Sequence, residues 1–288
     1  MIPKSFKAEI VGHIGRNVFA NRDRSIKTPL ILCISGPPGM GKTYQTHEVL
    51  RDLDVAICDL PGSAFENESA GAPAEAIQEC YRRASSMWAK GRPAAIVIDD
   101  VDAAIGQWGE LTQYTVNRQL VCGTLMALAD NPYVCYSGEG AMKIRTETYR
   151  VPIIMTCNDS GKLYAPLMRP GRTRSFVWVP GEDDRSAVVQ SMFPDLEIQE
   201  ARMLIEALDG YARGISPRYG GGVPVSLYSD ILAFLEDEWL HSVIDGHTAR
   251  EMMSMDVPRF ESNSKIALQE LIERGKMLLS EDRNYLEA

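Results

Sequence analysis

The residues best suited to chemistry form a glycine-rich segment near the N-terminus. It matches the pattern G-x-x-x-x-G-K-[S/T] and consists of Gly36, Pro37, Pro38, Gly39, Met40, Gly41, Lys42 and Thr43. Glycines let a backbone curl so that its N–H groups point at phosphate oxygens. A lysine at this place reaches the β- and γ-phosphates, and the following hydroxyl binds Mg²⁺. The segment therefore predicts a binding loop for ATP and Mg²⁺.

The sequence on either side supports this prediction. The apolar run LILCIS precedes the loop and reads as a strand, and TYQTHEVL follows it and reads as a helix. A helix that begins at the loop adds the favourable field of its N-terminus to a bound phosphate. The alternative is a glycine- and proline-rich turn with a chance lysine, which this context disfavours.

Two adjacent carboxylates, Asp99 and Asp100, end the apolar run AAIVIDD. In a nucleotide hydrolase of this pattern, Asp99 holds Mg²⁺ through water and Asp100 polarises the attacking water. The alternative is a strand that ends in a solvated turn. The phosphate loop upstream favours the catalytic interpretation.

Further along, the run VPIIMTCND places Asn158 at a strand end, and LMRPGR places Arg169 and Arg172 three residues apart. Asn158 is predicted to contact the γ-phosphate or orient the water, although asparagine is also a common turn residue. The arginines resemble those that AAA+ rings place against the nucleotide of a neighbouring subunit, which implies that they stabilise charge on its transferring phosphoryl group. Their alternative is a solvated basic turn. The order of the four motifs along the chain is that of AAA+ ATPases.

Short apolar runs alternate with helical stretches over the first 180 residues. Such runs are typical of strands buried on both faces of a parallel sheet, and the alternation predicts a doubly wound α/β domain. With the motifs above, this domain resembles the AAA+ P-loop domain, which has a central parallel sheet. The predicted strands are Leu30–Ser35, Val55–Leu60, Ala94–Ile98, Val151–Cys157 and Ser175–Val179. The predicted helices are Tyr44–Asp52, Pro73–Lys90 and Thr112–Ala129.

After Pro180 the pattern becomes helical, with glycine- and proline-containing breaks. The predicted helices are Asp184–Met192, Ile198–Leu208, Leu227–Val243 and Lys265–Leu279. We therefore expect a nucleotide-binding α/β domain over 1–180 and a small helical domain over 181–288.

Charge, the length of apolar runs and cysteine spacing argue against several kinds of partner and site. The net charge is −9, and residues 181–288 hold 21 acidic and 10 basic residues, which argues against binding of nucleic acid through its phosphates. No apolar run approaches the roughly 20 residues that span a bilayer, and no secretory signal precedes the first motif, so we expect no membrane partner and a cytoplasmic location. The six cysteines form no CxxC pair, which disfavours a zinc or thioredoxin-like site.

Several segments resemble rubisco activases, a family within the AAA+ ATPases. TQYTVNRQLVCGTLMALADNP, at 112–132, is similar to the stretch that follows the paired carboxylates in that family. AGAPAEAIQECYRRA, at 70–84, is similar to its first pore loop and the next helix. RVPIIMTCND and LYAPLMRPGR are similar to its sensor-1 and arginine-finger regions, and VPRFESNSKIALQELIERGKMLLSE to its C-terminal segment. The similarity spans nearly the whole chain.

The resemblance implies ATP hydrolysis by a ring, usually a hexamer, that remodels rubisco and releases inhibitory sugar phosphates. Several positions depart from the family. Phe65 stands where the family usually has Leu, Asp99 where plant members often have Asn, and Leu232 near the place of the sensor-2 arginine. Asp100 stands where AAA+ proteins in general usually have Glu. Arg218 is a poorly aligned substitute for that arginine.

Two loops are candidates for delivering force to a client. Phe65 lies in PGSAFENESAG, at 61–71, and Trp108 in AAIGQWGEL, at 103–111. In AAA+ rings the first of these loops lines the central pore, where an apolar side chain grips a polypeptide. The alternative for each is a side chain that tucks into its own domain.

The leading hypothesis is an ATP-driven remodelling chaperone that acts on rubisco. An AAA+ remodeller with another protein client is the main alternative. A nucleotide-gated scaffold with little turnover is a third, which the absence of arginine at Leu232 permits. A metabolite kinase fits least, because Asn158 and the paired arginines have no role in it.

Overall fold

The computed structural model describes residues 2–65, 71–106, 115–137, 144–216, 222–256 and 266–286. The chain divides into two compact units, Ile2–Val179 and Pro180–Ala288, which we describe separately as the N-terminal unit and the helical unit. Among the described helices, none combines the length and the apolar character needed to cross a membrane.

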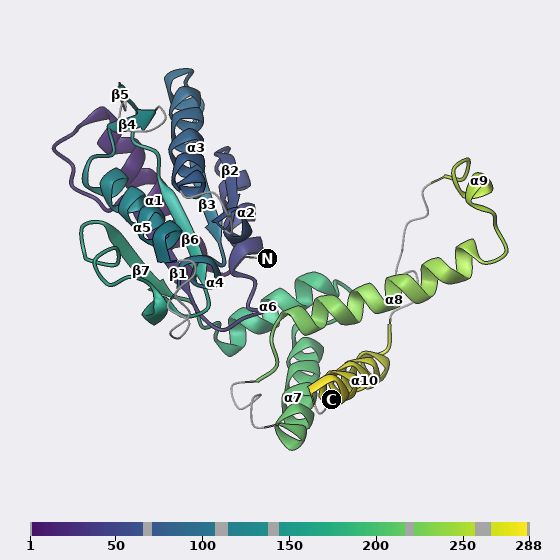
Figure 1. The fold of residues 1–288 in the computed structure, drawn as a ribbon. Helices are drawn as coiled ribbons and strands as arrows, with labels where there is room; N and C mark the ends of the chain where they lie inside the picture. Colours follow the sequence, from purple (N-terminus) through teal and green to yellow (C-terminus); the bar gives the residue numbers. More distant parts are fainter. Residues whose placement is uncertain are drawn as a thin grey trace. The chain divides into compact units, whose positions relative to one another are not determined.

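The N-terminal unit is built on a five-stranded parallel sheet with the strand order β2-β3-β6-β1-β7 (Figure 1). Every residue of β1 and β6 is buried, as expected for strands covered on both faces. The strands are β1 Ile31–Ser35, β2 Ala56–Pro61, β3 Ala94–Asp99, β6 Ile153–Cys157 and β7 Thr173–Val177. The predicted α/β fold with a central parallel sheet is therefore confirmed.

Helices flank this sheet, and a short antiparallel hairpin extends from it (Figure 1). The predicted helices correspond to α2, α3 and α5, while α1, α4 and the hairpin β4–β5 were not predicted. The elements are α1 Lys4–Arg22, α2 Lys42–Asp52, η1 Gly62–Phe65, α3 Ala72–Ala89, α4 Val101–Ile105, α5 Thr115–Asp130, β4 Val134–Ser137, β5 Ile144–Glu147 and η3 Ser160–Lys162. The buried face of α1 includes the polar side chains His13 and Asn17, so apolar residues do not recur at a clear helical spacing in its sequence.

The helical unit has its own apolar core, to which α6, α7, α8 and α10 contribute. A bidentate ion pair joins two of these helices: Arg185 donates to both carboxylate oxygens of Asp209 at 2.8 Å, and Asp209 also accepts from the backbone N–H of Val223. The helices are α6 Glu182–Met192, α7 Ile198–Ile215, α8 Ser226–Ile244, α9 Ala249–Met252 and α10 Leu268–Leu286.

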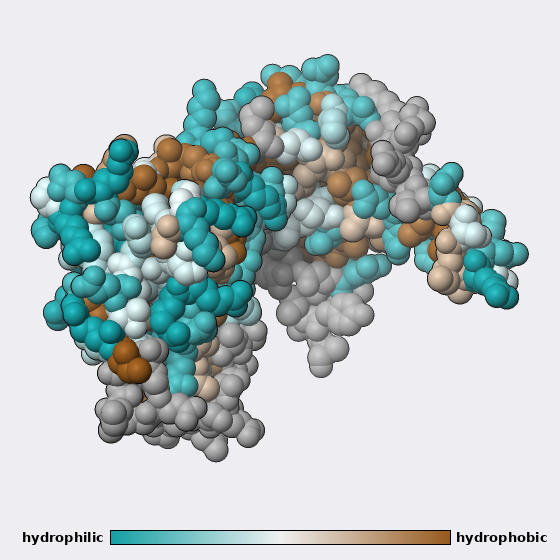
Figure 2. Space-filling model, turned by 90° about the horizontal axis from the view of Figure 1, so that it is seen from above, coloured by the Kyte–Doolittle hydropathy of each residue, from teal (hydrophilic) through white to brown (hydrophobic). Residues whose placement is uncertain are grey.

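Hydrophilic residues cover much of the surface, and brown hydrophobic areas interrupt them (Figure 2). In the N-terminal unit, Tyr44, Val177 and Val179 are among the exposed large apolar side chains. Val177 ends β7, which is the edge strand of the sheet, and Val179 follows it. All six cysteines are free thiols.

Candidate nucleotide-binding site

The phosphate loop, residues 36–43, connects β1 to α2, and α2 begins at Lys42. Gly36 and Gly41 have φ values of 156° and 70°, a region that favours glycine. A Cβ at Gly36 would lie 2.0 Å from the carbonyl oxygen of Trp178, so no larger residue fits there. Trp178 also donates from its indole N–H to the carbonyl of Met40 at 3.1 Å. Trp178, which follows β7, thus packs closely against Gly36 and is hydrogen-bonded to Met40.

Lys42 is a buried cation, 6% exposed, whose hydrogen-bond partners are all neutral. Its ammonium group donates to the carbonyls of Gly36 and Pro37 at 2.8 and 2.9 Å and to the side-chain oxygen of Asn158 at 2.9 Å. Burial lowers the pKa of Lys42, and the nearby Asp100 carboxylate opposes that shift. A desolvated ammonium group without a hydrogen-bonded carboxylate is suited to an anionic ligand.

The predicted metal ligands Thr43 and Asp99 are linked through a third residue, Thr156. The Thr156 hydroxyl donates to Asp99 at 3.0 Å and lies 3.5 Å from the hydroxyl of Thr43. This link exists because β6 lies between β1 and β3 in the sheet, so the end of β6 reaches both neighbours. Hydroxyl and carboxylate oxygens are hard donors of the kind that Mg²⁺ prefers, so these residues fit that ion.

Asp100 and Asn158 occupy the same edge of the sheet and are both exposed. Asp100 has φ 48° and ψ 43°, a left-handed conformation that is uncommon for residues other than glycine. Asp102, which is 2% exposed, accepts hydrogen bonds from the backbone N–H groups of Asn158 and Asp159 at 3.1 and 3.0 Å. This contact fixes the backbone that carries Asn158.

Three supporting residues were missed from the sequence: Thr156, Asp102 and Trp178. Thr156 is a polar residue in the apolar run of β6, and Asp102 is a third acidic residue after the paired carboxylates. Thr156 and Asp102 could therefore have been singled out from the sequence. The contact of Trp178 with the phosphate loop could not, because it depends on β7 lying beside β1.

The two predicted finger arginines have opposite environments. Arg172 donates to both carboxylate oxygens of Asp130 at 2.7 Å and to the carbonyl of Pro166 at 2.7 Å, all within its own chain. Arg169 is exposed, and in the part of the chain that the structure describes its guanidinium has no hydrogen-bond or ion-pair partner. In this structure the guanidinium of Arg172 is engaged within its own chain, and its role toward a neighbouring subunit stays a prediction. Its guanidinium braces the loop that presents Arg169.

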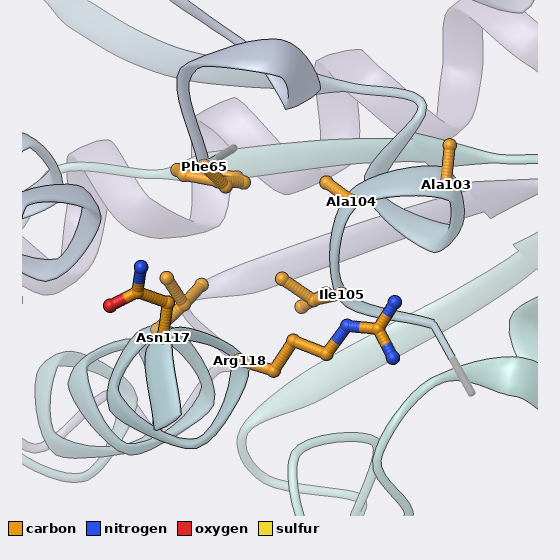
Figure 3. Close-up of a pocket in the computed structure, with 7 residues that line it drawn as sticks. Phe65, Ala103, Ala104, Ile105, Asn117 and Arg118 are labelled. Atoms are coloured by element: carbon orange, nitrogen blue, oxygen red, sulfur yellow. The ribbon is translucent and has the colours of Figure 1, made fainter. Parts of the chain in front are cut away.

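Phe65 is buried, at 5% exposure, within the apolar core of the N-terminal unit. Figure 3 shows its ring facing a cavity of about 230 Å³ that Ala104, Ile105, Asn117 and Arg118 also line. The prediction of an exposed pore-loop side chain is therefore wrong, since the turn η1 directs the ring toward α4 and α5. Trp108 lies outside the described residues.

The place of the sensor-2 arginine is apolar in the structure as well. Leu232 lies in α8 and is packed against the core of the helical unit. Arg218 lies outside the described residues.

A family model for the "ATPase family associated with various cellular activities (AAA)" matches residues 32–181, the stretch that holds the phosphate loop, both carboxylates, Asn158 and the arginines. The chain therefore belongs to the AAA family of ATPases.

Within that family its similarity is to rubisco activases, as the sequence motifs indicated. The chain is 36% identical to the chloroplastic ribulose bisphosphate carboxylase/oxygenase activase of Spinacia oleracea over 98% of its own length and 58% of that protein. The activases of Zea mays and Vigna radiata var. radiata are each 35% identical over 98% of the chain, which covers 63% and 62% of those proteins. The chain thus spans about three fifths of the length of these relatives.

Proposed function

We propose that the protein hydrolyses ATP with Mg²⁺ and couples hydrolysis to the remodelling of a protein client. The observation that supports this most directly is the ammonium group of Lys42. It is buried among neutral oxygens of the phosphate loop and hydrogen-bonded to Asn158, which follows the neighbouring strand β6. Lys42 would bind the β- and γ-phosphates, and Thr43 and Asp99 would hold the metal ion. Bound Mg²⁺ would draw charge from the transferred phosphoryl group.

Each remaining polar group has a distinct task in this mechanism. Asp100 would accept a proton from the water whose oxygen attacks the γ-phosphorus, while the bond between that phosphorus and the ADP oxygen breaks. Asn158 would orient the γ-phosphate or the water, and Asp102 fixes its backbone. Arg169 would stabilise the charge that develops on a neighbouring subunit's phosphoryl group.

We propose rubisco as the client and a ring, in the family usually a hexamer, as the working form. The similarity to activases over 98% of the chain supports this proposal. The exposed apolar side chains of Val177 and Val179, at the edge of the sheet, are suited to subunit contact. A remodeller with a different client is the second candidate, which the burial of Phe65 favours. An intracellular location stays a prediction.

The test separates nucleotide chemistry from client identity. Lys42→Ala should lose ATP binding in calorimetry. Asp100→Asn should still bind ATP but release phosphate about 10²- to 10⁴-fold more slowly, because the water loses its base. Wild-type turnover in Asp100→Asn would contradict its role.

Rubisco inhibited by a sugar phosphate should regain activity with wild-type protein and ATP, and not with Asp100→Asn. ATP hydrolysis without this rescue would favour the second candidate.

A further inference from the structure

A second polar cavity lies away from the phosphate loop. It has a volume of about 440 Å³ and is lined by Arg24 and residues 26–29 before β1, by residues 129–133 after α5, and by Arg150 and Gly171. Residues 26–29, Arg150 and Gly171 precede β1, β6 and β7 of the parallel sheet, whereas the phosphate loop and Asn158 follow β1 and β6. Because these strands are parallel, the cavity lies at their N-terminal ends and the phosphate loop at their C-terminal ends. Its volume is within the range of small-molecule sites.

The lining of this cavity carries an excess of positive charge. Arg24, Lys27 and Arg150 line it, and the one carboxylate in the lining is Asp130. Both oxygens of Asp130 already accept hydrogen bonds from Arg172 at 2.7 Å. Among the described residues, no carboxylate pairs with Arg24, Lys27 or Arg150. Three cations therefore face one cavity without a counter-charge of their own.

Arg150 is the fixed part of this arrangement, since it is only 6% exposed. Its Nε donates to the side-chain oxygen of Asn17 at 2.5 Å, and a terminal nitrogen donates to the carbonyl of Thr28. Asn21 holds the backbone on both sides, accepting from the N–H of Arg150 and donating to its carbonyl at 2.8 Å. A desolvated guanidinium that is held only by neutral groups is costly unless an anion compensates it.

Arg24, the second cation in the cavity lining, is held in place by an aromatic ring. The guanidinium of Arg24 lies over the ring of Tyr133, 4.3 Å from its centroid. The hydroxyl of Tyr133 donates to the carbonyl of Ala20 at 2.6 Å, which fixes the ring against the end of α1. Arg24 therefore loses less conformational freedom on binding a ligand than a free surface arginine would.

We propose that this cavity binds a phosphorylated small molecule, with the phosphate paired to Arg24, Lys27 and Arg150. A guanidinium fork matches the geometry of phosphate oxygens, and 440 Å³ is roomier than a bare phosphate requires. The occupant would also contact Gly171, which lies in the loop between Arg169 and Arg172. Its binding would then change ATP turnover by a neighbouring subunit, a consequence that rests on the proposed function.

Binding can be tested on the full chain saturated with ADP and Mg²⁺, so that the phosphate loop is occupied. The probes are inorganic phosphate and glucose 6-phosphate, with glucose as the uncharged control, in calorimetric titrations. Wild-type protein should bind both phosphates saturably and not glucose. Arg24→Gln combined with Lys27→Gln should raise the Kd about tenfold or more, because two charge-assisted contacts are lost.

The matched control is Arg22→Gln, which removes a positive charge from the same region at a residue that does not line the cavity. It should leave the Kd unchanged. Absence of saturable binding by wild-type protein, or equal affinity in the Arg24/Lys27 double variant, would overturn the proposal. These titrations need no ATP turnover, so they succeed or fail independently of the proposed hydrolysis.

Discussion

At the scale of single residues, Arg169 and Arg172 show how neighbours of one type acquire different roles. We expect Arg169→Ala to lower ATP turnover by about 10³-fold or more, the range that a finger arginine supplies, with an unchanged melting temperature. Arg172→Ala should instead lower the melting temperature, since it leaves Asp130 and the carbonyl of Pro166 without their donor. Phosphate release and thermal melting measure the two effects. Normal turnover in Arg169→Ala would contradict its assignment.

A buried histidine gives the N-terminal unit a pH dependence. Burial, assisted by the nearby Arg16 cation, lowers the pKa of His13 to about 3. The unfolded chain takes up a proton below its ordinary pKa of 6.5 and the folded chain does not, so stability is complete above that pH and falls as the pH decreases.

Lowering the pH from about 7.5 to 5.5 should therefore reduce the free energy of unfolding by about 1.4 kcal/mol, because His13 is protonated only in the unfolded chain. Urea denaturation followed by tryptophan fluorescence at both pH values measures the loss. His13→Gln does not titrate, so its loss over the same interval should be smaller by that amount. An identical pH dependence in both proteins would show that His13 is not buried in its neutral form.

At the scale of elements, the turn η1 decides what Phe65 does. The ring belongs to the apolar core beside α4 and α5, so Phe65→Ala should lower the free energy of unfolding by about 3 kcal/mol. Phe65→Leu, which retains most of the apolar contact, should cost less than about 1.5 kcal/mol. Urea denaturation measures both. An unchanged stability in Phe65→Ala, with lost client remodelling, would restore the role in gripping a polypeptide.

The connection between β7 and the phosphate loop is equally specific. Gly36→Ala would place its Cβ 2.0 Å from the carbonyl oxygen of Trp178, so the loop or the end of β7 must move. Calorimetry should show ATP affinity weakened or lost. The control is Gly123→Ala in α5, where an added Cβ meets nothing within 4 Å. That change should leave affinity intact and raise stability by up to about 1 kcal/mol. Unaltered affinity in Gly36→Ala would show that the loop adapts.

At the scale of the whole molecule, mixed assemblies test the proposed action of Arg169 on the nucleotide of a neighbouring subunit. Protein carrying Lys42→Ala and protein carrying Arg169→Ala should each be inactive. Mixed assemblies should regain part of the ATPase activity, because an intact Arg169 can then lie beside an intact Lys42. Phosphate release in titrated mixtures measures this, with Arg172→Ala as the comparison. Mixed assemblies that form but stay inactive would exclude action of Arg169 between subunits.

The sequence by itself determined the parallel sheet and the polar groups at one edge of it. Strands buried on both faces are mostly apolar, so β1, β3 and β6 could be recognised in the sequence as nearly continuous apolar runs. A phosphate loop needs glycine, lysine and threonine at fixed spacing, and the carboxyl ends of parallel strands share one edge. The sequence alone therefore predicts that Lys42, Asp99 and Asn158 lie close together.

Tertiary structure alone decided the features that depend on contacts distant in sequence. The first helix, α1, escaped prediction because Asn17 and Asn21 on it bind Arg150, which lies about 130 residues away. Whether Phe65 points outward, and whether Arg172 is free, depended on α4, α5 and Asp130. A residue type states which interactions a side chain can make, and only the packed neighbours determine which of them it makes.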